Sequence, residues 1–431
     1  MIASNLSVNE TSHLCFAGVD VTTLAERYGT PLYLLDEGRI RERCRTYRRA
    51  MTEAFGEGSF PLYAGKALCV KDIYRIMREE GMGIDVVSSG EIYTARAAGF
   101  PMERAYFHGN NKTDADVAFA MESGVGCFVC DSVDELDAIE REASRRGIRQ
   151  KVLLRLTPGI DPHTHRAIST GRVDSKFGAA IETGQAEALC REALAREHID
   201  LHGYHCHIGS QIFETTPFED ALRIMLAFTA RIRESLGFLA TEINLGGGLG
   251  VRYLAEHPEV DYAACVARIG AVAKEVAAEL SLPLPVFRME PGRSIVADAG
   301  MTLYTVGSVK TIPGFKNYVS VDGGMPDNPR FALYESPYTV EPANRMNDAR
   351  DFVCSIAGRC CESGDLIQEG VALPRPVRGD LIAVLTTGAY NYAMASNYNR
   401  IPRPPIVLIA EGKDRLIVRR ETFEDLLRNE L

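Results

Sequence analysis

Long hydrophobic stretches, a targeting segment and an excess of positive charge are all missing from this sequence. No window of the 431 residues approaches the roughly 18 uninterrupted apolar residues that a membrane helix needs, because charges or prolines interrupt each candidate. Residues 1–21 lack a basic region followed by an apolar core, so we expect no signal peptide. The net charge of -10 argues against nucleic acid or a membrane as the main partner.

Cysteine is present, but its spacing is not that of a metal site. The chain has 11 cysteines, of which Cys127 and Cys130 form a C-x-x-C pair that no second pair completes. An odd number of cysteines without an export signal indicates reduced thiols. We therefore expect a cytoplasmic protein that holds no metal.

Short apolar runs alternate with helical patterns through the first two thirds of the chain. A helix is expected over residues 37–55, and eight apolar runs are interpreted as strands, at residues 60–64, 84–87, 105–108, 127–130, 151–156, 203–207, 242–245 and 286–290. Capping boxes are predicted at Ser88–Glu91, Ser132–Glu135 and Thr216–Glu219. Eight strands alternating with helices predict a closed (β/α)8 barrel, an α/β fold. An open doubly wound sheet is the alternative, and the strand count and the missing dinucleotide fingerprint disfavour it.

Beyond residue 292 the pattern changes to β-rich pieces separated by Gly, Pro and Asp turns. These pieces are residues 302–312, 318–321, 352–356, 381–386, 405–410 and 415–418. Residues 14–19 and 31–35 are candidates for further strands of the same domain. The sequence thus predicts a barrel domain at 36–292, and a mostly antiparallel β domain built from 1–35 and 293–431.

Chemically distinctive residues stand at the carboxyl ends of four predicted barrel strands. They are Lys66, His207–Ser210, Gly246–Gly248 and Glu290–Arg293. A lone lysine after a strand is most often a solvated loop residue. In a (β/α)8 barrel, however, the loops after the strands carry the active site, so the four groups are expected to converge.

Each of these groups is suited to bind one part of pyridoxal phosphate. The amine of Lys66 can form a Schiff base with a carbonyl, and an apolar wall beside it would favour the neutral amine. Gly246, Gly247 and Gly248 let backbone N–H groups approach a phosphate, to which Ser210 and Arg293 add a hydroxyl and a charge. His207 can lie on the pyridine ring, and Glu290 can keep the ring nitrogen protonated.

Simpler interpretations exist for each group alone. The glycine run could be a tight turn, and it lacks the spaced form of a nucleotide motif. His205 and His207 share a strand face and could bind a metal, although no third ligand is evident. Glu290 or Arg293 could belong to a structural ion pair. The agreement of four strand ends on one cofactor favours the joint interpretation.

At these residues the sequence resembles the pyridoxal-phosphate decarboxylases with an alanine-racemase-like barrel, and specifically the diaminopimelate decarboxylases. In the first part of the chain the resemblance rests on Gly29–Tyr33, Tyr63–Ala67, Pro162–His165, Ile168–Gly171, Asp174–Gly178 and His205–Gln211. In the last part it rests on Asp322–Met325, Asn328–Arg330, Ala332–Tyr334, Cys361–Asp365, Gly388–Tyr390 and Ser396–Asn399, whereas Phe331 stands where many relatives have proline. The expected activity is decarboxylation of meso-2,6-diaminopimelate to L-lysine and CO2, the last step of lysine biosynthesis.

The resemblance also implies roles for individual residues. Lys66 would hold the cofactor, and the cofactor contacts would be completed by His207, Ser210, Gly248, Glu290, Gly292, Arg293 and Tyr390. Substrate would be bound by Arg293, Arg330, Tyr334, Glu362 and Tyr390. Cys361 would be the proton donor, because a thiol is protonated near neutral pH and can still donate its proton.

In such enzymes Cys361 and Glu362 reach the site from the partner subunit, which implies a homodimer with shared active sites. Two other functions remain open at this point. One is a sister decarboxylase for another cationic amino acid or for carboxynorspermidine. The other is a non-catalytic pyridoxal-phosphate carrier, which would have no need of the proton donor Cys361.

Overall fold

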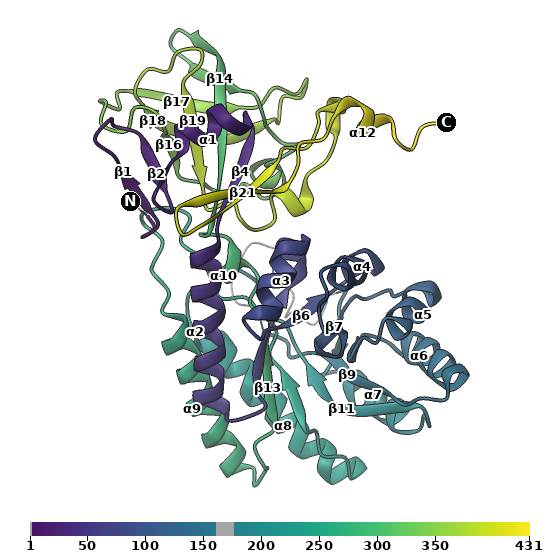
Figure 1. Cartoon of the computed structure of the whole chain (residues 1–431). Coiled ribbons are helices and arrows are strands. Elements are labelled where there is room, and N and C mark those ends of the chain that lie inside the picture. Colours follow the sequence, from purple (N-terminus) through teal and green to yellow (C-terminus); the bar gives the residue numbers. More distant parts are fainter. Residues whose placement is uncertain (1, 161–175) are drawn as a thin grey trace. The chain divides into compact units, whose positions relative to one another are not determined.

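The computed structural model describes residues 2–160 and 176–431, which form two compact units (Figure 1). Unit 1 comprises Met1–Glu42, Val251–Glu259 and Arg293–Leu431. Unit 2 comprises Arg43–Gly250 and Val260–Gly292. Helix α2 (Glu37–Phe55), whose bounds are those predicted, has residues in both.

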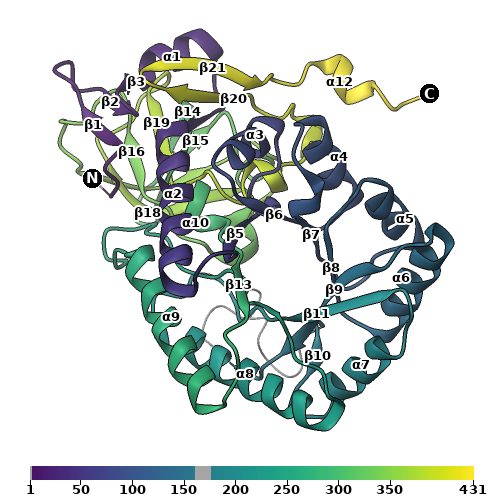
Figure 2. The same ribbon diagram turned by 60° about the horizontal axis from the view of Figure 1, so that its bottom comes forward.

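Unit 2 is a closed barrel of eight parallel strands, as the sequence predicted (Figure 2). The strands are β5 (Phe60–Ala64), β6 (Gly83–Val86), β7 (Ala105–Phe107), β8 (Cys127–Cys130), β9 (Gln150–Thr157), β11 (Ile199–His205), β12 (Glu242–Asn244) and β13 (Val286–Met289). Pairing of β8 with β9, and of β13 with β5, completes the ring. A two-residue strand, β10 (Ala179–Ala180), pairs with β9 outside the ring. The open sheet is therefore excluded.

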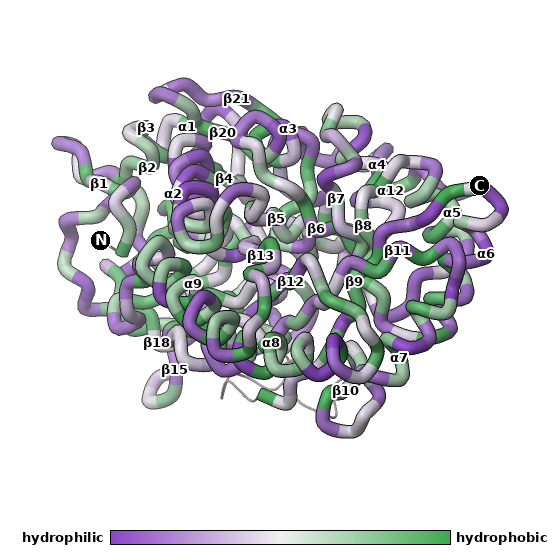
Figure 3. Tube along the Cα trace, turned by 90° about the horizontal axis from the view of Figure 1, so that it is seen from below, coloured by the Kyte–Doolittle hydropathy of each residue, from purple (hydrophilic) through white to green (hydrophobic). Residues whose placement is uncertain are grey.

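Helices surround the ring of strands (Figure 2). They are α3 (Lys71–Glu79), α4 (Ser89–Ala97), α5 (Asp114–Glu122), α6 (Val133–Arg146), α7 (Gln185–Leu194), α8 (Thr216–Leu236) and α9 (Tyr262–Glu279). The residues of α2 are largely hydrophilic, whereas those of α9 are more hydrophobic (Figure 3). No helix in residues 2–160 or 176–431 combines the length and the apolar character that crossing a bilayer requires.

The predicted capping boxes are only partly correct. Ser88 and Ser132 cap α4 and α6, since their hydroxyls accept the N–H three residues later. The carboxylate of Glu91, however, accepts the N–H of Val87 rather than that of Ser88. The box at Thr216 is wrong, because Thr216 is already the first residue of α8.

A buried charge cluster fills part of the barrel around Glu242. The Glu242 carboxylate accepts hydrogen bonds from the hydroxyl of Tyr106 at 2.6 Å and from Nζ of Lys151 at 2.7 Å. A guanidinium nitrogen of Arg288 lies 3.4 Å from the same carboxylate. Glu242 is 2% exposed, so its charge is held in the interior by these three partners.

Replacing Glu242 with glutamine is expected to destabilise the protein by about 3–5 kcal/mol, because it leaves Lys151 and Arg288 without their buried counter-charge. Urea unfolding of the apo-protein measures this as a lower midpoint. Glu259→Gln is the matched control, since the Glu259 side chain is 84% exposed and pairs only at the surface with Arg252. Equal midpoints for the two variants would contradict the proposed importance of the cluster.

Unit 1 contains a mostly antiparallel sheet with strand order β18-β17-β15-β14-β4-β20-β21, in which β14 also pairs with β19 and β19 with β16. The strands are β4 (Leu32–Asp36), β14 (Gly300–Ile312), β15 (Lys316–Val321), β16 (Val340–Pro342), β17 (Phe352–Ala357), β18 (Leu366–Leu373), β19 (Leu381–Leu385), β20 (Ile406–Ala410) and β21 (Lys413–Val418). The pairs β15–β17 and β20–β4 are parallel. Strand β18 was missed by the sequence analysis.

The amino-terminal residues form a separate three-stranded sheet in unit 1. It consists of β1 (Leu6–Val8), β2 (Leu14–Phe16) and β3 (Val19–Asp20) and precedes helix α1 (Val21–Tyr28). Three further helices of this unit are α10 (Arg293–Val296), α11 (Arg330–Tyr334) and α12 (Phe423–Leu427). Its main apolar core joins Leu14, Leu24, Leu34, Leu303 and Val407.

Candidate active site

The carboxyl ends of the barrel strands surround a cavity of about 460 Å³. Its lining includes three of the predicted cofactor residues, Lys66, His207 and Glu290. His108, Arg155 and His205 also line it, together with Val87, Gly109, Asn110, Asn111 and Phe177. Three of the four predicted strand ends are thus brought together within unit 2.

Lys66 follows β5 on a short turn and faces a carboxylate. Its Nζ donates a hydrogen bond to Oδ2 of Asp85 at 3.2 Å, and the lysine side chain is 41% exposed whereas that of Asp85 is fully buried. The expectation of an apolar wall beside Lys66 is therefore wrong. Asp85 ends up there because β6 pairs in register with β5, which sets Asp85 opposite Ala64.

Gly65 fixes the path of this turn. A Cβ atom at Gly65 would lie 2.4 Å from the hydroxyl of the buried Tyr74 and 3.0 Å from the carbonyl of Asp85. Glu91 lies on the same side, and burial raises its pKa to about 7 although the N–H of Val87 opposes that rise. The backbone at Gly65 is consequently packed against α3 and β6, and position 65 has no room for a side chain.

Glu290, directly after β13, is held by three buried side chains. The amide of Asn244 donates to Oε1 at 2.7 Å. Nε2 of His108 lies 2.9 Å from the same oxygen, and Nε2 of His205 lies 3.3 Å from Oε2. Oε1 thus has two partners, whereas Oε2 has one and keeps a lone pair for a further donor.

The protonation states follow from this arrangement. Burial by itself raises the pKa of Glu290, but the imidazoles of His108 and His205 outweigh it, and the pKa lies well below its ordinary value. Burial lowers the pKa of His205 to about 4 although Glu290 opposes the change. At neutral pH Glu290 is accordingly a carboxylate and His205 a neutral imidazole.

The structure changes which residues could bind a metal together with His205. His205 forms a group with His108 and Glu290, whose ligand atoms all lie within 4.8 Å of one another. The two ligands besides His205, which spacing in the sequence did not reveal, come from two other strand ends. His207 is not a member of this group.

The glycine run after β12 packs directly on its neighbours. A Cβ at Gly247 would lie 2.1 Å from the carbonyl oxygen of Glu290, a distance that no side chain tolerates. The N–H of Gly246 donates to Oδ1 of Asn244, which also holds Glu290. The segment after Ser210 joins this run, since the N–H of Ile212 donates to the carbonyl of Gly248. Ser210, Gly246, Gly247 and Gly248 are therefore brought to one side of the barrel mouth.

Two further predicted residues take places beside these loops. His207 lies next to the glycine run, where a Cβ at Gly246 would come within 2.8 Å of its Nδ1 atom, and burial lowers its pKa well below the ordinary value. A Cβ at Gly292 would lie 2.8 Å from that of Ala64, which places Gly292 against the Lys66 turn. An uncharged imidazole and a bare backbone are what a flat aromatic cofactor requires there.

In unit 1 the structure gathers the predicted substrate residues around Tyr390. The guanidinium carbon of Arg293 lies 4.7 Å from the Tyr390 ring centre, and that of Arg330 lies 5.6 Å from it. Arg330 also lies 5.4 Å from the ring of Tyr334, and Arg293 donates to the hydroxyl of Tyr253 at 2.9 Å. Both arginines are 5% exposed, so two buried cations share a tyrosine-walled site.

Cys361 and Glu362 lie in the loop between β17 and β18 of unit 1, and both are exposed. The N–H of Cys361 donates to Oδ1 of Asn399 at 2.9 Å, and a carboxylate oxygen of Glu362 accepts the N–H of Gly364. The thiol of Cys361 is free, as are all eleven cysteines.

Sequence reasoning missed Asp85, His108 and Arg155. His108 and Arg155 stand at or next to the carboxyl ends of predicted strands, so the rule that selected Lys66 would have found them, whereas Asp85 lies inside its predicted strand. Asn244 was missed for the same reason. The motifs Pro162–His165 and Ile168–Gly171, and the start of Asp174–Gly178, lie outside the described residues.

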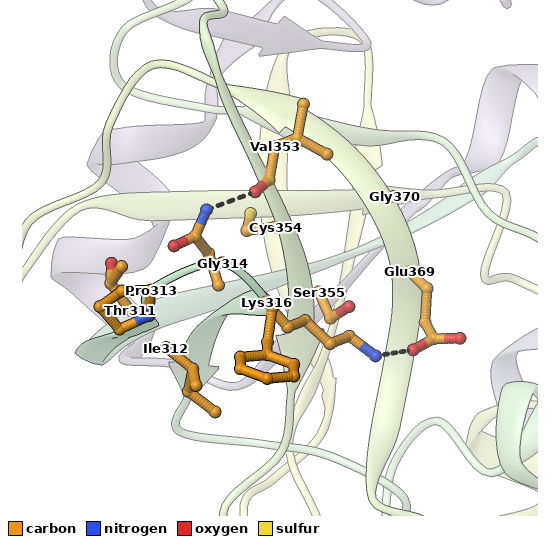
Figure 4. A pocket seen from close by; sticks show the side chains of 12 residues that line it. Thr311, Ile312, Pro313, Gly314, Lys316, Val353, Cys354, Ser355, Glu369 and Gly370 are labelled. Carbon is orange, nitrogen blue, oxygen red and sulfur yellow. Dashed lines mark hydrogen bonds and ion pairs between the residues drawn. The ribbon is translucent and has the colours of Figure 1, made fainter.

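A second cavity, of about 660 Å³, lies at the turn between β14 and β15 in unit 1 (Figure 4). It is bounded by Phe315 and by the ion pair of Lys316 with Glu369, and the Asn317 amide donates to the carbonyl of Val353 beside it (Figure 4). None of the residues that line this cavity is a predicted site residue. It is not a candidate for the chemistry described above.

The barrel cavity fits pyridoxal phosphate on three structural observations. A lysine amine lines it, a buried carboxylate faces it, and a run of glycines without side chains packs against Glu290 beside it. These groups come from different strand ends and meet the aldehyde, ring nitrogen and phosphate of the cofactor respectively.

Comparison with known proteins agrees with this fit. Residues 37–297 match the family described as "Pyridoxal-dependent decarboxylase, pyridoxal binding domain". Diaminopimelate decarboxylase of Bacillus subtilis is 47% identical over 98% of this chain and 96% of its own length. The enzyme of Staphylococcus aureus is 40% identical over 98% of both. A crystal structure of the m. jannaschii enzyme in complex with L-lysine superimposes with a TM-score of 0.90 at 33% identity, covering 99% of this chain and 98% of that one.

Proposed function

Because the chain belongs to the diaminopimelate decarboxylases, we propose a division of labour among its residues in that reaction. The protein decarboxylates meso-2,6-diaminopimelate to L-lysine and CO2, the last step of lysine biosynthesis, with pyridoxal phosphate as cofactor. When bound, the cofactor supplies an electron sink for the electron pair left by the departing carboxyl group.

The barrel residues hold and tune that cofactor. Lys66 binds it covalently, and Asp85 keeps the lysine amine at the cavity wall. Oε2 of Glu290 would accept a hydrogen bond from the protonated ring nitrogen, and His207 would stack on the ring. Ser210, Gly246, Gly247, Gly248 and Gly292 bind the phosphate through a hydroxyl and backbone N–H groups, to which Arg293 and Tyr390 add a charge and a second hydroxyl.

Unit 1 recognises the far end of the substrate. Diaminopimelate ends in a second amino acid head group, and the guanidinium of Arg330 suits its carboxylate. Nε of Arg330 is buried and makes no hydrogen bond within residues 2–160 and 176–431, so a donor stays available. Arg293, Tyr334, Tyr390 and Glu362 complete the substrate site in this proposal.

Cys361 donates the proton that replaces the lost carboxyl group, and it acts in the site of the partner subunit. The exposure of Cys361 and Glu362 on a surface loop supports this assignment, because a catalytic thiol is of use only where substrate reaches it. We infer a twofold homodimer with shared sites. Eleven free cysteines support a cytoplasmic location, where thiols stay reduced.

We propose that the domain limits 36–292 and 1–35 with 293–431 are those of the folding units. Limited proteolysis tests these limits.

The observation that supports the proposed activity is the convergence of Lys66, His207 and Glu290 on one cavity. Its test is incubation of purified protein with pyridoxal phosphate and meso-diaminopimelate, followed by measurement of L-lysine and CO2. A panel with ornithine, lysine and carboxynorspermidine examines the sister activities. If the protein binds the cofactor but forms neither L-lysine nor CO2 from meso-diaminopimelate, the proposed function is refuted.

Arg330→Ala is expected to raise the KM for diaminopimelate by about tenfold to a hundredfold or more, because a charge-assisted hydrogen bond to the substrate is lost. Arg330→Lys should recover only part of this loss, since an ammonium cannot form the two-pronged contact. Steady-state kinetics of lysine release measure both variants. Wild-type KM values for Arg330→Ala would remove this residue from the substrate site.

A further inference from the structure

His108 occupies a central place between two buried carboxylates. Its Nε2 atom lies 2.9 Å from Oε1 of Glu290 and 3.9 Å from Oδ1 of Asp85, and the residue is 4% exposed. Asp85 in turn accepts the hydrogen bond of Lys66. A line of charged and polar groups therefore runs from the amine of Lys66 through Asp85 and His108 to Glu290.

The surroundings of His108 leave little freedom to the imidazole. Its ring packs edge-to-face on that of His205, with centres 4.8 Å apart. Its Nε2 atom faces the two carboxylates, and Oδ1 of Asp85 makes no hydrogen bond within the described part of the chain. Loss of the imidazole would remove the side chain that stands between Asp85 and Glu290 in the cavity wall.

We propose that His108 is a positioning residue of the decarboxylation, which orients the Glu290 carboxylate toward the ring nitrogen and separates it from the carboxylate that pairs with Lys66. The proposal rests on the assignment of Glu290 to the ring nitrogen given above. Oε1 accepts the hydrogen bond of Asn244 and lies 2.9 Å from Nε2 of His108, so Oε2 is the oxygen that we assign to the cofactor. His108 acts through Glu290 and touches no reacting atom.

The consequence is selectivity for the ring nitrogen in cofactor binding. Pyridoxal phosphate and its 1-deaza analogue, in which C–H replaces the ring nitrogen, share the aldehyde and the phosphate. Only the former can pair with Glu290. The ratio of their dissociation constants therefore reports the Glu290 contact alone, and damage to the fold would weaken both ligands equally.

The test titrates the apo-enzyme with both compounds and follows the absorbance of the bound aldehyde. The wild-type protein should prefer pyridoxal phosphate, and Glu290→Ala should abolish the preference. His108→Leu should lower it by about tenfold or more, whereas His108→Gln, which keeps an N–H at similar reach, should retain most of it. His202→Gln is the matched control, because His202 pairs with Asp200 on the same strand at the surface. If the leucine variant does not fold, His108→Asn replaces it, since its amide is too short to reach Glu290.

Equal weakening of both ligands by His108→Leu, or an unchanged preference, would overturn the proposal. Stoichiometric zinc in the purified apo-enzyme, released together with a gain in cofactor affinity, would instead assign His108, His205 and Glu290 to a metal. If Glu290→Ala itself keeps the preference, the assignment of Glu290 to the ring nitrogen fails. That outcome differs from failure of His108 alone.

Discussion

Replacing Lys66 with alanine is expected to abolish covalent attachment of pyridoxal phosphate and to lower kcat by about a thousandfold or more. The physical reason is that Lys66, on the turn after β5, is the lysine among the residues that line the barrel cavity. Borohydride reduction of the wild-type holoenzyme, followed by peptide mapping, should locate the cofactor on Lys66.

Lys71→Ala provides the control for this prediction. Lys71 is exposed at the start of α3, five positions further along the chain, and has no place in the cavity. Its replacement should change neither the cofactor spectrum nor turnover. A trapped cofactor on any other lysine, or near-normal kcat in Lys66→Ala, would contradict the assignment.

Replacing Cys361 with alanine is expected to lower kcat by about a hundredfold to ten-thousandfold, the range for loss of a general acid. Cofactor binding should stay unchanged, because the loop of Cys361 contributes none of the barrel groups that hold the cofactor. Single-turnover kinetics with diaminopimelate measure the protonation step directly.

Cys360→Ala is the matched control for Cys361. The backbone N–H of Cys360 donates to Asp365, and burial raises the pKa of its thiol to about 12, so it is a poor proton donor at neutral pH. The variant should keep nearly full activity. If Cys360→Ala lost activity and Cys361→Ala kept it, Cys360 would be the proton donor and the assignment of Cys361 would be wrong.

The barrel could be predicted because each strand is a short apolar run with helical spacing after it. Both ends of β5 and of β8 agree with the prediction. Strand β11 begins at Ile199, earlier than predicted, because the polar residues Asp200 and His202 interrupt its apolar pattern. β18 was missed because Gln368, Glu369 and Gly370 interrupt its apolar pattern.

The candidate site could be predicted only where a residue type is unusual for its place. Lys66, Glu290 and the glycine run stood out in this way. The surroundings of Lys66 could not be predicted, because they depend on the register of β6 beside β5, which brings Asp85 to the amine. The same holds for His108 and His205, whose contact with Glu290 joins three strands that are distant in the sequence.

In the proposed homodimer, each decarboxylating site takes Lys66 from one subunit and Cys361 from the other. Its most direct test is co-expression of Lys66→Ala and Cys361→Ala chains with different affinity tags, purification of the mixed dimer and assay of lysine formed from diaminopimelate. In a shared arrangement one of the two sites regains both residues, so the mixed dimer should have about half of the wild-type activity although each parent dimer is nearly inactive. A mixed dimer as inactive as its parents would contradict the account.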